Sequence, residues 1–197
     1  MIPRHLLIGV TVMLALVLSI GLYLRHLSRT EAQRQRLSED ARPVTPPASG
    51  PTETVTLYVA DDASGGLHPQ PFQIPLPEGR QQRAEELLRA LLQIYSRPDS
   101  PHPLSSAAEL RSVFLIDPGV AVIDLNAAFA DQHQSGVLTE QLTVNSLVQT
   151  LAFNVPGISR IRILVDGNTR ETLAGHVDLT EFFDVNAVSQ TASQNAQ

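Results

Sequence analysis

The chain has 197 residues, a formal net charge of −6 and no cysteine, which excludes disulfides, thiolate catalysis and cysteine-bound zinc. All fourteen basic residues are arginine, and the stretch from Glu53 to Asp184 holds eight of them against seventeen acidic residues, a net charge of −9. Aromatic residues make up 5% of the chain, and an acidic, aromatic-poor module is a poor nucleic-acid binder. Nucleic acid is therefore not expected as a partner.

Nineteen uncharged residues, Leu6 to Leu24, follow a short tail at residues 1–5. As a helix they would span about 28 Å, close to the ~30 Å hydrocarbon core of a bilayer. A cleaved secretory signal and a buried core helix are the alternatives, but no small-x-small cleavage site follows the run. We therefore predict a single transmembrane helix, 6–24, in contact with the lipid of the cytoplasmic membrane.

Residues 25–52 form a predicted linker, charged at first and then proline-rich. The stretch from Pro43 to Pro51 favours an extended chain of about 3.1 Å per residue. Four arginines flank the span on this side, against Arg4 on the other, and the positive-inside rule would then place the large domain in the cytoplasm. These are Arg25, Arg29, Arg34 and Arg36. At the other end, residues 185–197 are rich in Ser, Gln, Asn and Ala and are predicted to be disordered.

The first half of the remaining domain reads as two strands and a helix. Alternating apolar and polar residues predict a strand at Thr54–Val59, and Asp61–Gly66 has the composition of a turn. Phe72–Leu76 is extended, and its prolines confine it to the edge of a sheet. An apolar stripe with helical spacing predicts a helix at Ala84–Tyr95, which Pro98 ends.

The second half begins with a hairpin. The turn residues Asp117-Pro118-Gly119 separate strands at Leu110–Ile116 and Val120–Leu125, since proline sets φ at the first corner and glycine tolerates positive φ at the second. A second apolar stripe predicts a helix at Val144–Val155, which ends before Pro156. Three more strands are predicted after it: Ile161–Val165, Thr169–Leu173 and Gly175–Leu179. The order ββ-α-ββ-α-ββ predicts one α+β domain at 53–184, with a mixed, mostly antiparallel sheet and two helices on one face.

The chain from Thr54 to Phe183 resembles a GerMN domain, the module of the GerM family of sporulation and spore germination. Six stretches carry the resemblance, namely 55–59, 85–92, 119–125, 146–151, 163–167 and 174–179. The resemblance implies a bacterial extracytoplasmic domain held at the cytoplasmic membrane, with a fold similar to ring-building motifs and no established enzymatic activity. It therefore places the domain on the side opposite to the one that the flanking arginines favour. Many relatives carry a lipid-modified cysteine, which the transmembrane helix would replace here.

Four polar residues are the candidates for a ligand or partner surface: Asp61, Asp62, His176 and Asp178. His176 and Asp178 would share one face of a strand, where a His-x-Asp pair can bind a metal or act as a base with its orienting carboxylate. The structural interpretation is favoured, because the chain has no G-x-S-x-G, H-E-x-x-H or phosphate-binding glycine loop. We therefore expect no enzyme activity, no cofactor and no metal.

The expected function is protein interaction or assembly in the cell envelope, with a partner protein or with a second copy. Two sheet edges are candidates for strand pairing, one represented by Phe72 and Ile74 and the other by Thr169 and Glu171. Binding of peptidoglycan or another small ligand is the alternative, and an envelope hydrolase is a further one.

Overall fold

The computed structural model describes residues 50–116 and 118–194. The predicted membrane helix at 6–24 and most of the predicted linker lie outside these residues. Among the helices that are described, none has the length and apolar character needed to cross a membrane. The elements in chain order are β1 (Thr52–Asp61), β2 (Gly66–Pro75), α2 (Arg80–Tyr95), β3 (Leu110–Ile116), β4 (Val120–Leu125), α3 (Ala127–Asp131), α4 (Val137–Asn154), β5 (Arg160–Val165), β6 (Phe183–Asp184) and α5 (Val185–Gln194).

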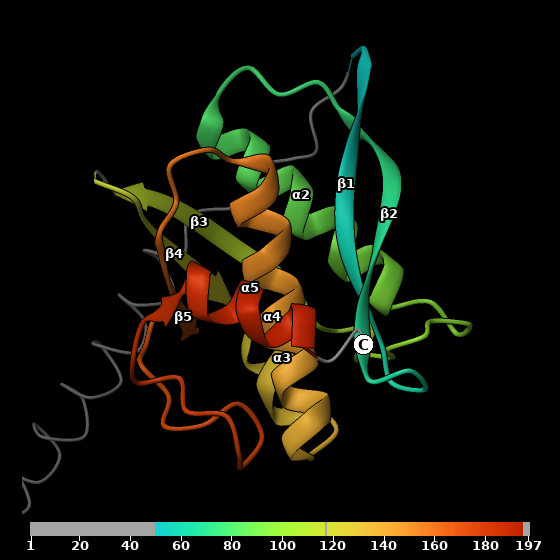
Figure 1. Ribbon diagram of the computed structural model, residues 1–197, viewed down its shortest axis with the longest axis vertical. Coiled ribbons are helices and arrows are strands. Elements are labelled where there is room, and N and C mark those ends of the chain that lie inside the picture. Colours follow the sequence, from blue (N-terminus) through green and yellow to red (C-terminus); the bar gives the residue numbers. More distant parts are fainter. Residues whose placement is uncertain (1–49, 117, 195–197) are drawn as a thin grey trace, which may run out of the picture. The chain divides into compact units, whose positions relative to one another are not determined.

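The described strands form two sheets, so the prediction of a single sheet is wrong, whereas the α+β class is confirmed. β1 and β2 make an antiparallel two-stranded sheet, and the other four strands make a sheet in the order β3-β4-β5-β6. The predicted β3–β4 hairpin is antiparallel as expected, and β4 pairs with β5 in parallel. Helix α4 packs against β1 and α2 packs against β3, so the two helices lie between the sheets in Figure 1.

One hydrophobic core joins both sheets to these helices. Strand alternation sends every second side chain of β4 and β5 inward, and α2 and α4 turn their apolar stripes toward this row. Both amphipathic helices predicted from the sequence are confirmed, although α4 begins seven residues earlier than expected. The largest fully buried aliphatic side chains of these elements are Leu87, Leu88, Leu91, Ile123, Leu125, Leu147, Leu151 and Ile161.

The two strands predicted after β5, Thr169–Leu173 and Gly175–Leu179, are wrong. This part of the chain has only the isolated bridges Val165↔Asn168 and Thr172↔Asp178. Several of its backbone N–H groups bind a buried carboxylate, Glu140 of α4, instead of a neighbouring strand. A side chain 34 or more residues away thus accepts hydrogen bonds from N–H groups that were expected to bond a neighbouring strand.

The predicted disordered tail is also wrong for its first part, because Val185–Gln194 forms helix α5. The carboxylate of Asp184 accepts hydrogen bonds from the N–H groups of Asn186 and Ala187 and so caps this helix. Val188 is buried, and the Ser189 hydroxyl donates to the side chain of Gln149 in α4. Docking on α4 stabilises a segment whose composition alone favours disorder.

Polar side chains of the helices bond the edge of β1 that faces away from β2. The N–H groups of alternate β1 residues donate to these side chains: Thr56 to Asn154 Oδ1 (3.4 Å), Tyr58 to Thr150 Oγ1 (3.0 Å) and Ala60 to the Tyr95 hydroxyl (2.8 Å). Ser146 and Asn154 donate in return to the carbonyls of Tyr58 and Thr56. Ser146, Thr150 and Asn154 recur every four residues and so form one row along α4. This edge of β1 is therefore closed to another strand.

Candidate interaction surface

The four polar residues predicted as a ligand surface each bond a different neighbour. Asp61 accepts the N–H groups of Ala63 (2.9 Å) and Ser64 (3.4 Å), and the first of these bonds lowers the pKa of the Asp61 carboxyl. Asp178 accepts both the hydroxyl and the N–H of Thr180, which lower its pKa. Both carboxylates stabilise tight turns, and neither is directed into a cavity by these bonds.

His176, the third of them, binds the buried carboxylate of Glu140. The Nδ1 of His176 lies 2.8 Å from Glu140 Oε1, and Glu140 Oε2 accepts the N–H groups of Ala174, His176 and Val177 at 2.9–3.1 Å. Burial alone would raise the pKa of Glu140, but these hydrogen bonds together lower it to about 2. Glu140 is thus charged at neutral pH and anchors the loop that follows β5.

Asp62, the fourth, is itself exposed and begins a row of hydrogen-bonded groups that runs inward through His102, Thr143 and His133 to the carbonyl of the exposed Gln134. We call this row the buried polar chain after its three buried central residues. His102 and Thr143 are fully buried, and His102 lies between the Asp62 carboxylate (2.6 Å) and the Thr143 hydroxyl (2.6 Å). The order carboxylate–imidazole–hydroxyl is that of a nucleophilic triad. Here the hydroxyl is enclosed by protein, so a substrate cannot reach it. Among the described residues, no group of three His, Asp or Glu side chains could hold a metal ion.

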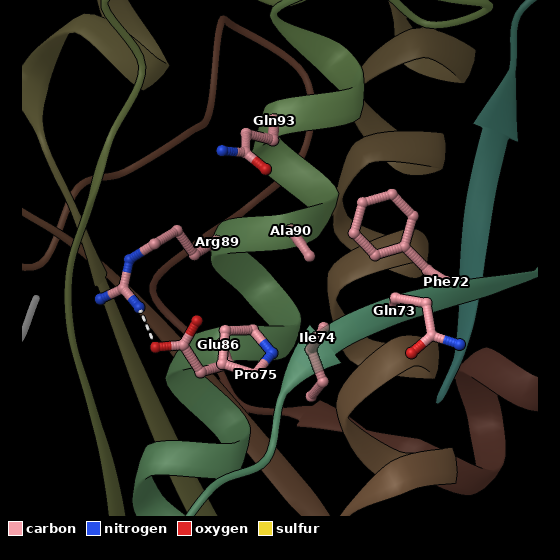
Figure 2. A pocket seen from close by; sticks show the side chains of 8 residues that line it. All are labelled: Phe72, Gln73, Ile74, Pro75, Glu86, Arg89, Ala90 and Gln93. Atoms are coloured by element: carbon pink, nitrogen blue, oxygen red, sulfur yellow. Dashed lines mark hydrogen bonds and ion pairs between the residues drawn. The ribbon is translucent and has the colours of Figure 1, made fainter. Parts of the chain in front are cut away.

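The predicted edge residues Phe72 and Ile74 lie in β2 and line a hollow between this strand and α2. Figure 2 shows Phe72 and Ile74 on one side and Ala90 on the other, with the Glu86–Arg89 ion pair (2.7 Å) on the α2 side. The hollow has a volume of about 160 Å³, below the ~300–1,000 Å³ typical of small-molecule sites. It has room for a single side chain but not for a cofactor.

Prolines block the outer edge of β2. In an antiparallel ladder, two residues opposite each other either exchange both N–H···O=C bonds or point their N–H and C=O groups away from each other, out of the pair. Thr56 and Tyr58 donate away from β2, so their partners Pro71 and Pro69 also point outward. Pro75, the partner of Thr52, has the same orientation, because it lies four residues after Pro71 in the same strand. Because proline has no N–H, three of the outward donors of this edge are missing, and strand pairing here is unfavourable.

The other predicted edge residues, Thr169 and Glu171, lie in the loop after β5 and belong to no strand. Thr169 accepts a long hydrogen bond from Arg162 (3.4 Å), and the carbonyl of Glu171 accepts the N–H of Leu179 (3.0 Å). Neither of the two predicted edges is therefore suited to strand pairing, and the face of the larger sheet is the next candidate surface.

We call the solvent-facing side of the four-stranded sheet the outer sheet face. It is formed by the side chains that alternate with the buried row, and its members are Phe114, Ile116, Val120, Val122, Arg160, Arg162 and Leu164, together with Phe182 of the following loop. Phe114 is 38% exposed, Ile116 53% and Phe182 42%. β3 and β4 carry apolar residues on both sides, so the sequence does not tell which side the helices cover.

The chemistry of the outer sheet face changes across its width. Large apolar side chains cover β3 and β4, whereas β5 carries two arginines whose guanidinium carbons lie 5.3 Å and 5.2 Å from the ring centroid of Phe182. At one end, Arg111 binds both Asp124 (3.1 Å) and Asp166 (2.7 Å). Aromatic and arginine side chains that are held in place in this way are typical of the central residues of protein interfaces.

Comparison with known proteins identifies a family match. Residues 56–171 match the family Germane, described as sporulation and spore germination, which confirms the resemblance deduced from the sequence. No curated protein matches the chain. The tandem GerMN domains of the sporulation protein GerM from Bacillus subtilis are 19% identical, with a TM-score of 0.51 over 68% of this chain and 46% of that one. A protein described as a lipoprotein, from Clostridium perfringens, is 24% identical, with a TM-score of 0.48 over 68% and 87% of the two chains.

Proposed function

This chain belongs to the Germane family of sporulation and spore germination domains, and we propose that it is a membrane-tethered interaction domain of the bacterial cell envelope. In this proposal residues 6–24 anchor it in the cytoplasmic membrane and the proline-rich linker holds the domain on the outer side. The arginines that flank the span favour the opposite side, but long domains translocate largely regardless of charge. Its role is to bind another envelope protein or a second copy of itself.

The outer sheet face is the observation that carries this proposal. Phe114, Ile116 and Phe182 are large apolar side chains that remain exposed although the domain buries a complete core. Exposed apolar side chains grouped with arginines are more common at binding surfaces than elsewhere on a soluble domain. The two edges of the β1–β2 sheet are blocked, which makes strand pairing at that sheet unfavourable for a partner.

The same geometry supports a non-catalytic role. The hydroxyl of the buried polar chain is enclosed, and the hollow beside β2 is too small for most substrates. Two other carboxylates that the sequence offered as candidates, Asp61 and Asp178, stabilise turns. A peptidoglycan site would need a larger polar groove than the hollow at β2 provides.

A photocrosslinking experiment tests the proposed surface. We expect that p-benzoylphenylalanine at Phe114 of the full-length chain, expressed in cells, forms a discrete crosslinked species upon irradiation. Phe114 is an exposed aromatic residue in the apolar half of the outer sheet face, on the edge strand β3, so an aromatic probe can replace it without disturbing the core. The adduct is identified by mass spectrometry as a named envelope protein or as a dimer of this chain.

Phe153 provides the matched control, because it is also an exposed phenylalanine, 58% accessible, but lies on α4 beside Tyr58. The same probe at Phe153 is expected to give no such species. Equal crosslinking from the two positions, or none from Phe114, would contradict the assignment of the outer sheet face.

A further inference from the structure

The buried polar chain consists of four successive short hydrogen bonds. Asp62 Oδ1 lies 2.6 Å from His102 Nδ1, and His102 Nε2 lies 2.6 Å from Thr143 Oγ1. Thr143 Oγ1 lies 2.7 Å from His133 Nε2, and His133 Nδ1 lies 2.7 Å from the carbonyl oxygen of Gln134. A carboxylate stands at one end and a carbonyl at the other, and both groups only accept hydrogen bonds.

These four bonds need more protons than neutral side chains can supply. Each bond requires one hydrogen, whereas each neutral imidazole has a single N–H and the threonine has a single O–H. The three intermediate groups therefore supply three hydrogens for four bonds. The Thr139 carbonyl, 3.1 Å from Thr143 Oγ1, is another acceptor, so donation to it would only increase the deficit.

We propose that the buried polar chain holds one additional proton, as an imidazolium at His102 paired with the Asp62 carboxylate, and that this proton acts as a pH-sensitive latch. With it, all four bonds are made and the chain has no net charge. The latch joins three loops to α4, because Asp62 follows β1, His102 follows α2, and His133 and Gln134 follow α3. This inference does not depend on which partner the outer sheet face binds.

The groups around the two imidazoles favour His102 as the site of the charge. Burial lowers the pKa of His133, which faces the Gln134 carbonyl, whereas His102 contacts a carboxylate directly. Glu140 of α4 is the other carboxylate that acts on His133, and the edge of Tyr95 faces His102 with 5.0 Å between ring centroids. Burial raises the pKa of Tyr95 to about 12, so its hydroxyl stays neutral and adds no charge.

Loss of the proton would open the latch. Without it, one of the two terminal contacts has no hydrogen: either His102 Nδ1 and Asp62 Oδ1 present lone pairs to each other across 2.6 Å, or His133 Nδ1 and the Gln134 carbonyl do so across 2.7 Å. In the unfolded chain a histidine releases its proton near pH 6.5. The folded state then binds one proton more than the unfolded state at pH values above this, so the stability falls as pH rises.

Nitrogen NMR of the imidazole rings tests the proposal directly. We use the full-length chain, labelled with ¹⁵N-histidine, in detergent micelles at pH 7.5, and assign His102 by the signal that is lost in His102→Asn. Both ring nitrogens of His102 are expected to carry hydrogen, and those of His133 only one. A His102 ring with a single N–H at pH 7.5 would overturn the proposal.

Asp62→Asn is the decisive variant, because an amide can donate to His102 Nδ1 and so supplies the fourth hydrogen without charge. In this variant His102 is expected to be neutral at pH 7.5. Between pH 7 and 8 the unfolding equilibrium constant of the wild type is expected to rise about tenfold relative to that of Asp62→Asn.

Asp178→Asn is the control, since the Asp178 carboxylate is exposed, accepts from Thr180 and lies outside the buried polar chain. It should retain the pH dependence of the wild type. If Asp62→Asn keeps that dependence as well, the latch is refuted. If Asp62→Asn does not fold, the protonation state of His102 in the wild type decides alone.

Discussion

Replacing Glu140 with alanine is expected to lower the free energy of unfolding by about 3–5 kcal/mol, the range for breaking a buried, hydrogen-bonded charge. Glu140 is fully buried and accepts from the backbone N–H groups of Gly136, Ala174, His176 and Val177 as well as from the His176 side chain. Alanine would leave these donors without their acceptor and would remove the connection between α4 and the loop after β5. Chemical denaturation of the full-length chain at pH 7 measures the change.

Asp178→Ala is the matched control for a carboxylate in the same loop. Its hydrogen bonds go only to Thr180, within the turn, and the residue is exposed. The loss in this variant should stay within about 1 kcal/mol. A loss at Asp178 as large as that at Glu140 would mean that the loop is sensitive to any substitution, and the role given to Glu140 would then be wrong.

The Glu140 carboxylate should also make the domain sensitive to acid. Its pKa is about 2 in the folded state, against an ordinary value of 4.5, so its contribution to stability is fully present above about pH 4.5. As pH falls from about 4.5 toward 2, the unfolded chain binds a proton that the folded state does not, and up to ~3 kcal/mol of stability is lost. Denaturation curves between pH 7 and 3 test this. The Glu140→Gln variant should show a smaller acid dependence than the wild type, and an equal dependence would contradict the assignment.

Local patterns were enough to predict helices α2 and α4 and the β3–β4 hairpin, but not α3 or α5. The apolar stripe of α2 and the Pro-Gly turn are each recognisable from a short stretch of sequence, and the structure confirms both. The number of sheets was not predictable in this way, because it depends on what bonds the outer edge of β1. Asn154 and Thr150, about 95 residues away, occupy that edge, and nothing in the strand itself indicates this.

The same limit applies to the polar residues. Asp62 was proposed from the sequence for a ligand or partner surface, but no local pattern links it to His102, its partner 40 residues further along the chain. Four segments of the chain must come together before the buried polar chain exists, and no spacing motif records this. Glu140 was missed because it precedes Val144, where the predicted helix begins, and because a glutamate is normally a solvated residue.

Gly119→Ala is expected to be among the most damaging small substitutions in the described domain, at about 2–5 kcal/mol. Gly119 has φ +77°, and an added Cβ would lie 2.7 Å from the carbonyl oxygen of Gly157 and 2.8 Å from the Ser159 hydroxyl. The left-handed backbone costs a residue with a Cβ about 1–2 kcal/mol, and overpacking against a backbone atom adds about 1–3 kcal/mol. The thermal or chemical unfolding midpoint of the full-length chain reports the loss.

Gly79→Ala separates this effect from glycine removal in general. Gly79 has an extended φ of −159°, and nothing lies within 4 Å of its added Cβ, so the expected change is within about 1 kcal/mol. Equal losses at the two glycines would contradict the steric argument. The carbonyl of Gly119 also accepts the N–H groups of Ser159 (2.8 Å) and Arg160 (3.1 Å), so this turn holds the start of β5 beside β4. Gly119→Ala should therefore weaken crosslinking from Phe114 as well, because the apolar and arginine-bearing halves of the outer sheet face meet at this junction.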